Sequence, residues 1–149
     1  MTTEESKNTV GIILQPTRGG ELNETALMNF YRSMCSLIAA AGPSHTWIFR
    51  PHPKQSVAEV KQILSHFIGV DKHIQVLGNS DLSFVQFLGR CHAFFGLSSA
   101  ALIDAHSLGK KVYSLASENM AKNATISDYP IEFVQTKQKN WQQDILSKL

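Results

Sequence analysis

The chain has 149 residues, of which 43% are hydrophobic and 17% are charged, a composition typical of one globular domain. The net charge of +2 is too small to indicate a nucleic-acid partner. No apolar stretch approaches the ~20 residues of a membrane span, and the polar first residues carry no secretion signal, so we expect a cytoplasmic protein. The two cysteines, Cys35 and Cys91, have neither metal-site nor disulfide spacing.

Apolar segments of strand length alternate along the chain with stretches of helical period, which is typical of a parallel sheet covered by helices. The segments lack a polar face, as expected of strands that are buried on both sides. They comprise residues 10–14, 46–49, 73–77, 93–97, 111–115 and 131–134. The pattern predicts one doubly wound, Rossmann-like α/β domain of about six parallel strands over residues 9–149, after a disordered tail at residues 1–8.

Apolar residues at helical spacing predict a first helix that begins at Asn23 and ends before Gly42. Ser56 followed by Glu59 has the spacing of a capping box and predicts the start of a second helix. Further helices are expected over residues 81–89, 99–108 and 139–149. In such folds ligands bind at the carboxyl ends of the strands, so the segments after the strands are the candidates for chemistry.

The segment after the first strand, residues 15–20, ends in two glycines that let backbone N–H groups approach a ligand closely. It matches neither the dinucleotide-binding pattern nor the phosphate loop of nucleotide hydrolases. A ligand-lining loop and a plain connector therefore both stay open. Its candidate ligand residues are Thr17, Arg18, Gly19 and Gly20.

The second strand ends in an HP element, Arg50-Pro51-His52-Pro53-Lys54. The two prolines exclude a helix and hold His52 at the edge of the sheet. The imidazole can donate to a phosphate, and Arg50 and Lys54 add permanent positive charge beside it. We predict that His52 and Arg50 bind an anionic ligand. The alternative is that His52 is an ordinary polar residue of a surface loop and binds no ligand.

The fourth strand leads into Ser98 and Ser99 at a predicted helix start, whose unpaired N–H groups favour an anion. A cap would use one serine hydroxyl and leave the other available. Asp104 follows on the same helix, where its carboxylate suits a ribose diol or, alternatively, a structural hydrogen bond. The other histidines show no metal or triad spacing, so no metal site is predicted.

With its HP element and serine pair, nearly the whole chain resembles the carboxyl-terminal, nucleotide-binding half of GT-B glycosyltransferases. The two elements together are similar to those of bacterial sialyltransferases, polysialyltransferases and capsule or teichoic-acid polymerases. Residues 98–112 are also similar to a motif of UDP-N-acetylglucosamine 2-epimerases, with Lys111 in place of a proline. The resemblance implies that His52 and the serine pair contact phosphate, that residues 17–20 line the donor site and that Asp104 holds ribose.

The function that we expect is therefore the donor-binding half of a glycosyltransferase that uses a CMP-, CDP- or UDP-linked sugar, without metal or other cofactor. Family members carry the acceptor site and usually the catalytic base on another domain, so an amino-terminal domain or separate subunit is an expected partner and no catalytic residue is assigned. Association with a membrane surface stays open. The alternatives are a non-catalytic nucleotide-binding or regulatory module and a fragment of an epimerase-like enzyme.

Overall fold

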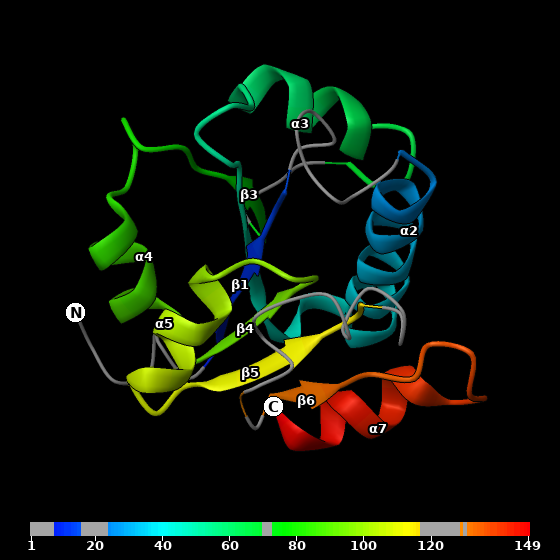
Figure 1. The fold of residues 1–149 in the computed structure, drawn as a ribbon. Coiled ribbons are helices and arrows are strands. Elements are labelled where there is room, and N and C mark those ends of the chain that lie inside the picture. The colour runs from blue at the N-terminus through cyan, green and yellow to red at the C-terminus, as the bar shows by residue number, and fades with distance from the viewer. Residues whose placement is uncertain (1–7, 16–23, 70–72, 117–128, 130) are drawn as a thin grey trace.

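The computed structural model describes residues 8–15, 24–69, 73–116, 129 and 131–149. They form a sheet of six parallel strands in the order β3-β2-β1-β4-β5-β6, with helices around it (Figure 1). This is the order of a doubly wound sheet, in which the direction of winding switches between β1 and β4. The structure confirms the predicted fold class, while the predicted tail lies almost wholly outside the described residues.

Each predicted strand is found within a residue or two of its expected bounds. The strands are β1 (Thr9–Ile13), β2 (Thr46–Arg50), β3 (Ile74–Val76), β4 (Ala93–Gly96), β5 (Lys111–Ser114) and β6 (Glu132–Phe133). The helices are α2 (Glu24–Ala41), α3 (Val57–Leu64), α4 (Phe84–Arg90), α5 (Ala101–Ser107) and α7 (Trp141–Lys148), with a 3-10 turn, η1 (Gly42–Ser44), after α2.

The sheet carries a separate hydrophobic core on each face (Figure 1). Helices α2, α3 and α7 cover one face, and α4 and α5 cover the other. Successive strand residues point to opposite faces, so Ile12 packs under α2 while Ile13 packs under α4 and α5. This two-sided burial explains why the strands carry apolar residues at nearly every position.

Side-chain caps define where two helices begin. The Ser56 hydroxyl accepts the Glu59 N–H at 3.0 Å, as the predicted cap requires. A full capping box, which we did not predict, starts α4: Ser83 Oγ accepts the Gln86 N–H at 3.1 Å, and Gln86 Oε1 accepts the Ser83 N–H at 2.9 Å. The helix expected from residue 81 therefore begins at Phe84.

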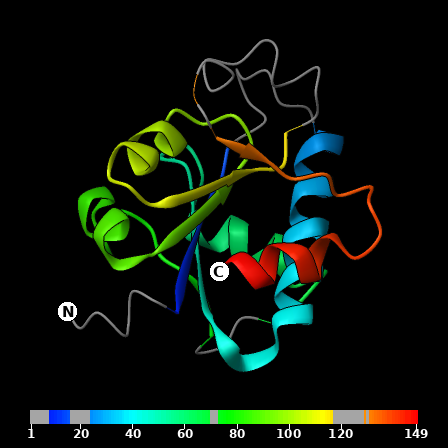
Figure 2. The ribbon, with the colours of Figure 1, turned by 90° about the horizontal axis from the view of Figure 1, so that it is seen from below.

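The last helix returns to the α2 side of the sheet and lies against α2 (Figure 2). Trp141 and Ile145 bury one face of α7 in the core that α2 and α3 share. Gln142 Nε2 donates to Ser36 Oγ on α2 at 2.8 Å. The end of α7 is tied to β6 by the ion pair of Lys148 with Glu132 at 2.7 Å. The helix thus completes the core around β1, β4 and β5.

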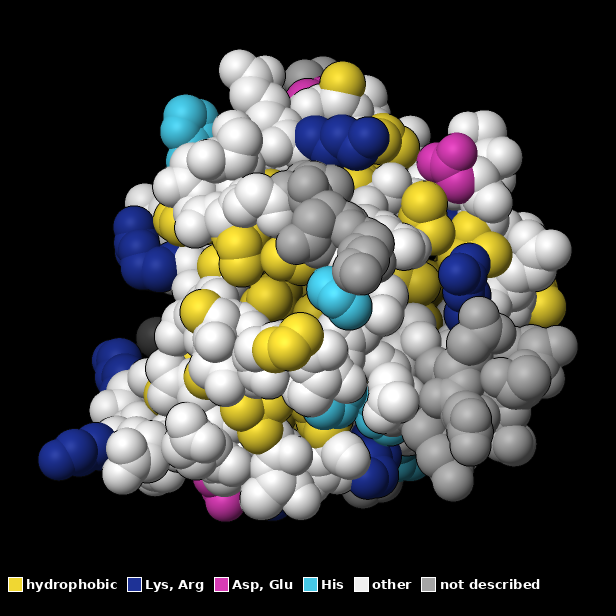
Figure 3. Space-filling model, turned by 180° about the vertical axis from the view of Figure 1, so that it is seen from behind, with side chains coloured by type: hydrophobic (Ala, Val, Ile, Leu, Met, Phe, Trp, Pro, Cys, Tyr) yellow, Lys and Arg dark blue, Asp and Glu magenta, His cyan; other side chains and the backbone are white. Residues whose placement is uncertain are grey.

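Four general features concern the molecule as a whole. No helix among the described residues is both long and apolar enough to cross a membrane. Within the same part of the chain, no group of three or more potential ligands is placed to hold a metal ion. On the face that Figure 3 shows, Lys and Arg side chains are scattered and do not gather in one patch. Cys35 and Cys91 are both buried.

Two histidines meet at the amino edge of the sheet. The rings of His45 and His92 are stacked with their centroids 6.2 Å apart, and His45 also lies against Trp47 at 5.9 Å. Burial, with a smaller contribution from His92, lowers the pKa of His45 below its usual value of about 6.5. The folded protein therefore favours the neutral imidazole at this position.

We expect the free energy of unfolding to fall as the pH drops below about 6.5, because the unfolded chain protonates His45 before the folded chain does. This contribution to stability is present above that pH and is lost as the pH falls through the lowered pKa. Urea unfolding at a series of pH values measures it. A His45→Gln variant should lose less stability between neutral and mildly acidic pH, and an unchanged pH dependence would contradict the assignment.

Candidate functional site

The segments that follow β2, β1 and β4 lie side by side at the carboxyl edge of the sheet. The Leu14 N–H donates to the Arg50 carbonyl at 3.1 Å, so β1 and β2 stay paired past their last strand residues. Continued two residues past the pair Ile13–Arg50 and three past the pair Ile12–Phe95, the register places Gln15 level with His52 on one side and with Ser98 on the other. His52, Gln15 and Ser98 therefore follow the ends of three adjacent strands.

The HP element forms a tight turn that holds the imidazole in one tautomer. The His52 carbonyl accepts the Gln55 N–H at 2.8 Å, and Gln55 Oε1 accepts the His52 N–H at 3.0 Å. The Lys54 N–H donates to His52 Nδ1 at 3.1 Å, which leaves the ring proton on Nε2. Burial and the charge of Lys54 lower the pKa of His52, so at neutral pH the ring is an uncharged donor.

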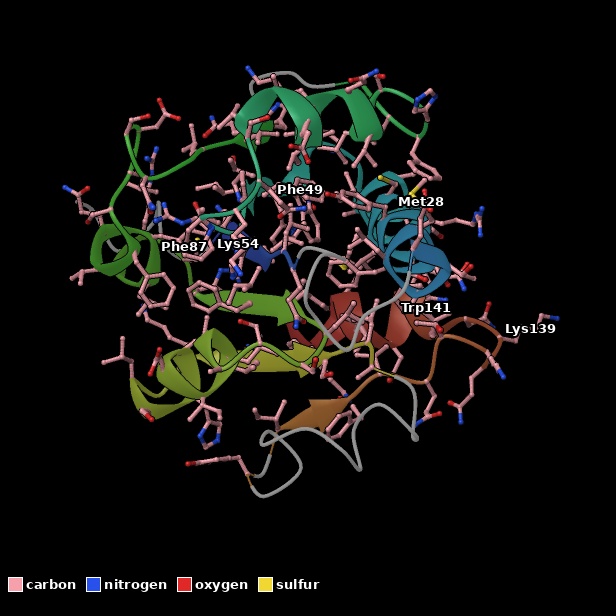
Figure 4. The ribbon with its side chains drawn as sticks, turned by 45° about the horizontal axis from the view of Figure 1, so that its top comes forward. Met28, Phe49, Lys54, Phe87, Lys139 and Trp141 are labelled. Atoms are coloured by element: carbon pink, nitrogen blue, oxygen red, sulfur yellow. The ribbon has the colours of Figure 1, made fainter. Side chains whose placement is uncertain are left out.

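Lys54 supplies the exposed positive charge of this turn. Its side chain is exposed, and in Figure 4 it lies over the middle of the sheet, on the side of Phe87 and away from Trp141 and Lys139. The turn therefore offers a neutral N–H donor together with an ammonium group, which is a suitable pair for an anion.

Gln15 joins the ends of β1 and β4 across the point where the winding of the sheet switches. Gln15 Oε1 accepts the Ser98 N–H at 2.8 Å, and Gln15 Nε2 donates to Ser98 Oγ at 3.2 Å. The contact from Ser98 Oγ back to Gln15 Oε1 is long, at 3.5 Å, so the serine proton can turn toward a ligand. The sequence analysis did not select Gln15, although a polar residue directly after a buried strand is a usable signal.

The two serines have different roles in the structure. Ser99 Oγ accepts the Ala101 N–H at 3.2 Å, and the Ser99 carbonyl accepts the Leu102 N–H at 3.1 Å, so Ser99 holds the turn that leads into α5. The Ser98 hydroxyl is bonded to Gln15 instead. Asp104 lies exposed in the first turn of α5. Its role toward ribose stays a prediction.

Ser114 fixes the loop that carries the serine pair. Its side chain is fully buried at the end of β5, where Oγ donates to the Leu97 carbonyl at 2.5 Å and accepts the Ala116 N–H at 3.1 Å. The Leu115 N–H adds a bond to the Gly96 carbonyl at 2.9 Å. Ser98 is thus held from both neighbouring strands, by Gln15 and through Ser114. The sequence analysis did not single out Ser114.

Arg50 is placed differently from the exposed phosphate ligand that the sequence analysis expected. The alternation of β2 turns its side chain to the face under α4, where it is buried. Its guanidinium donates to the Leu82 carbonyl, to Asn79 Oδ1 and, at 3.4 Å, to the Gly78 carbonyl. Arg50 therefore holds the segment between β3 and α4, and direct contact with a ligand stays a prediction.

The predicted glycine-containing loop cannot be placed. Thr17, Arg18, Gly19 and Gly20 lie outside the described residues. Within the part of the chain that the structure describes, the candidate residues that follow the carboxyl ends of neighbouring strands are His52, Ser98 and Ser99, and Asp104 lies in the helix α5.

Strand order, helix placement and polar groups at the switch point together define a Rossmann-like α/β domain with a candidate anion site at its carboxyl edge. The sequence matches no protein-family model and no curated protein sequence. Among solved structures, it is similar to a putative UDP-N-acetylglucosamine 2-epimerase from Listeria monocytogenes (TM-score 0.63, 15% identity), covering 97% of this chain and 36% of that one.

Two further structures of the same kind are similar to the chain. One is UDP-GlcNAc 2-epimerase from Neisseria meningitidis bound to UDP-GlcNAc (TM-score 0.61, 16% identity), for which the match covers 99% of this chain and 36% of that one. The other is the S. aureus MnaA–UDP complex (TM-score 0.60, 14% identity), with 97% and 38% covered. The chain has the fold of one part of these structures and spans little more than a third of their length.

Proposed function

We propose that this chain binds the nucleotide diphosphate of a UDP-type sugar at the carboxyl edge of its sheet, as one part of a GT-B-like transferase or epimerase. The observation that carries the proposal is the row of His52, Gln15 and Ser98 on three adjacent strand ends. His52 supplies a neutral N–H donor and Lys54 a charge, while Ser98 supplies a hydroxyl. Such donors stabilise the negative charge that develops on a leaving diphosphate.

The similar solved structures support a uridine nucleotide in preference to a cytidine nucleotide. One of them is bound to UDP-GlcNAc and another to UDP. The sialyltransferase-like donors that the motifs also suggest would carry cytidine instead. Asp104 and residues 17–20 belong to this proposal as the ribose-binding and loop parts of the site.

A second structural unit is part of the proposal. The chain covers little more than a third of the similar solved structures, which leaves most of their length without a counterpart here. In this proposal the acceptor site and the catalytic base lie on that second unit, which is either joined to this chain or supplied as a separate subunit.

We expect a His52→Ala variant to bind UDP at least fivefold more weakly than the unchanged protein, because a charge-assisted hydrogen bond to phosphate is lost. Isothermal titration calorimetry with UDP, UDP-N-acetylglucosamine, CDP, CMP and inorganic phosphate measures the effect and ranks the ligands. The proposal predicts that UDP and its sugar bind best.

A matched control is His66→Ala, because His66 is exposed beyond the end of α3 and away from the strand ends. This variant should bind UDP as the unchanged protein does. Equal affinities in the His52→Ala variant and the unchanged protein would refute the role of His52. Tighter binding of CMP or CDP than of UDP would favour the transferases with cytidine-linked donors.

A further inference from the structure

Arg50 is a buried cation directly beneath the candidate site. It is the last residue of β2, and only 6% of its surface is exposed. Its guanidinium carbon lies 5.6 Å from the centre of the Phe87 ring, which fixes the side chain on the α4 face of the sheet. His52 follows two residues later, so the two residues are separated by about 7 Å along an extended chain.

Every partner of this guanidinium is electrically neutral. The acceptors are the carbonyl oxygens of Gly78 and Leu82 and the amide oxygen of Asn79, and the remaining contact is the face of Phe87. Among the described residues, no carboxylate forms an ion pair with Arg50. Burial lowers the pKa of Arg50, and the carboxylate in the same segment, Asp81, accepts the Gly78 N–H at 3.1 Å. A guanidinium nevertheless keeps its proton at every physiological pH.

A buried charge without a counter-ion is costly, and structures normally pair it. The hydrogen bonds to neutral oxygens use three of its five N–H donors and bring no negative charge to the guanidinium. The apolar core around Phe87 screens the charge of Arg50 only weakly. The positive potential of Arg50 therefore extends to the carboxyl edge of the sheet. An anion bound at His52 and Ser98 would lie within that field.

We propose that Arg50 is the buried counter-charge of the bound phosphates and makes the site select ligands by their negative charge. This inference rests on the proposed function, because it takes the same site as the place of binding. Arg50 does not touch the ligand in this scheme. Its effect increases with ligand charge, so it favours a nucleoside diphosphate over a monophosphate and leaves an uncharged nucleoside unaffected.

The test measures uridine, UMP and UDP binding to the unchanged protein and to Arg50→Gln, by calorimetry and, for weak ligands, by NMR titration. We expect Arg50→Gln to bind UDP at least tenfold more weakly and UMP less affected, with uridine within twofold. A merely structural role would weaken all three ligands by a similar factor. Such a uniform loss, or no loss for UDP, would overturn the inference.

Two further variants keep the test decisive if Arg50→Gln does not fold, which thermal unfolding would show. Arg50→Lys keeps the charge and should keep the ratio of UDP to uridine affinity within threefold of the unchanged protein. Asn79→Ala removes one acceptor without changing the charge and should also keep that ratio. A tenfold fall of the ratio in either variant would overturn the inference.

Salt dependence separates the buried charge from the exposed one. The contribution of Lys54 should disappear at high ionic strength, whereas the contribution of Arg50 should persist. The UDP affinities of Arg50→Gln and of Lys54→Gln are therefore each compared with that of the unchanged protein at low and at high salt. If the unchanged protein binds no UDP, the proposed function fails; if it binds UDP but the charge dependence is absent, only this inference fails.

Discussion

A Phe87→Ala variant is expected to lose about 3–5 kcal/mol of unfolding free energy, the usual cost of deleting a buried aromatic side chain. Phe87 is fully buried in the core under α4 and α5. Its ring meets Phe94 edge-on at 5.2 Å and lies under the Arg50 guanidinium. The substitution therefore leaves a cavity, removes an aromatic pair and takes away one contact of a buried cation. Urea unfolding followed by circular dichroism measures the loss.

Val85→Ala on the same helix is the matched control for this prediction. Val85 is 78% exposed, so its truncation should change stability by no more than about 0.5 kcal/mol. A loss of less than about 1 kcal/mol in Phe87→Ala would show that α4 is not packed on the sheet as described.

A Gly11→Ala variant is expected to be less stable by about 1–3 kcal/mol, because the added methyl group has no room in the core. A Cβ at Gly11 would lie 2.6 Å from Phe87 Cζ and 2.7 Å from Phe94 Cδ1. Gly11 belongs to the central strand β1, where alanine would otherwise be favoured over glycine by about 0.5–1 kcal/mol. Thermal unfolding should therefore show a lower Tm in spite of the better backbone propensity.

The control for this second prediction is Gly89→Ala. An added Cβ at Gly89 meets nothing within 4 Å, and the residue lies within α4. Alanine there should stabilise the protein by about 0.5–1 kcal/mol. A lower Tm for Gly11→Ala together with a higher Tm for Gly89→Ala would separate the packing effect from the backbone effect. A higher Tm for Gly11→Ala would contradict the described positions of the Phe87 and Phe94 rings.

The strands were predictable because a strand that is buried on both faces appears in the sequence as a short apolar run bounded by turn residues. The start of α4 was not predictable with the same precision. The capping box of Ser83 and Gln86 sets its first residue, and Arg50 adds a long-range interaction by binding the carbonyls of Gly78 and Leu82 in the segment before it. That interaction joins residues about thirty positions apart, and periodicity within the helix does not contain it.

The candidate site was predictable only in part. The turn that the prolines impose around His52 and the local hydrogen bond of Ser99 to the Ala101 N–H both follow from local chemistry. Gln15 and Ser114 act across strands, since one binds the Ser98 backbone and the other binds the Leu97 carbonyl. Their importance depends on which strands are neighbours, and composition or spacing along the chain does not determine that order.

The strand order has a thermodynamic consequence. β2 and its HP turn belong to the first half of the chain, and β4 with Ser98 belongs to the second, joined across β1 by Gln15. A ligand bound to both the HP turn and Ser98 would link the two halves of the chain and would oppose their separation during unfolding. Its binding energy would then be gained only when the halves are assembled, so the melting temperature should rise with ligand concentration.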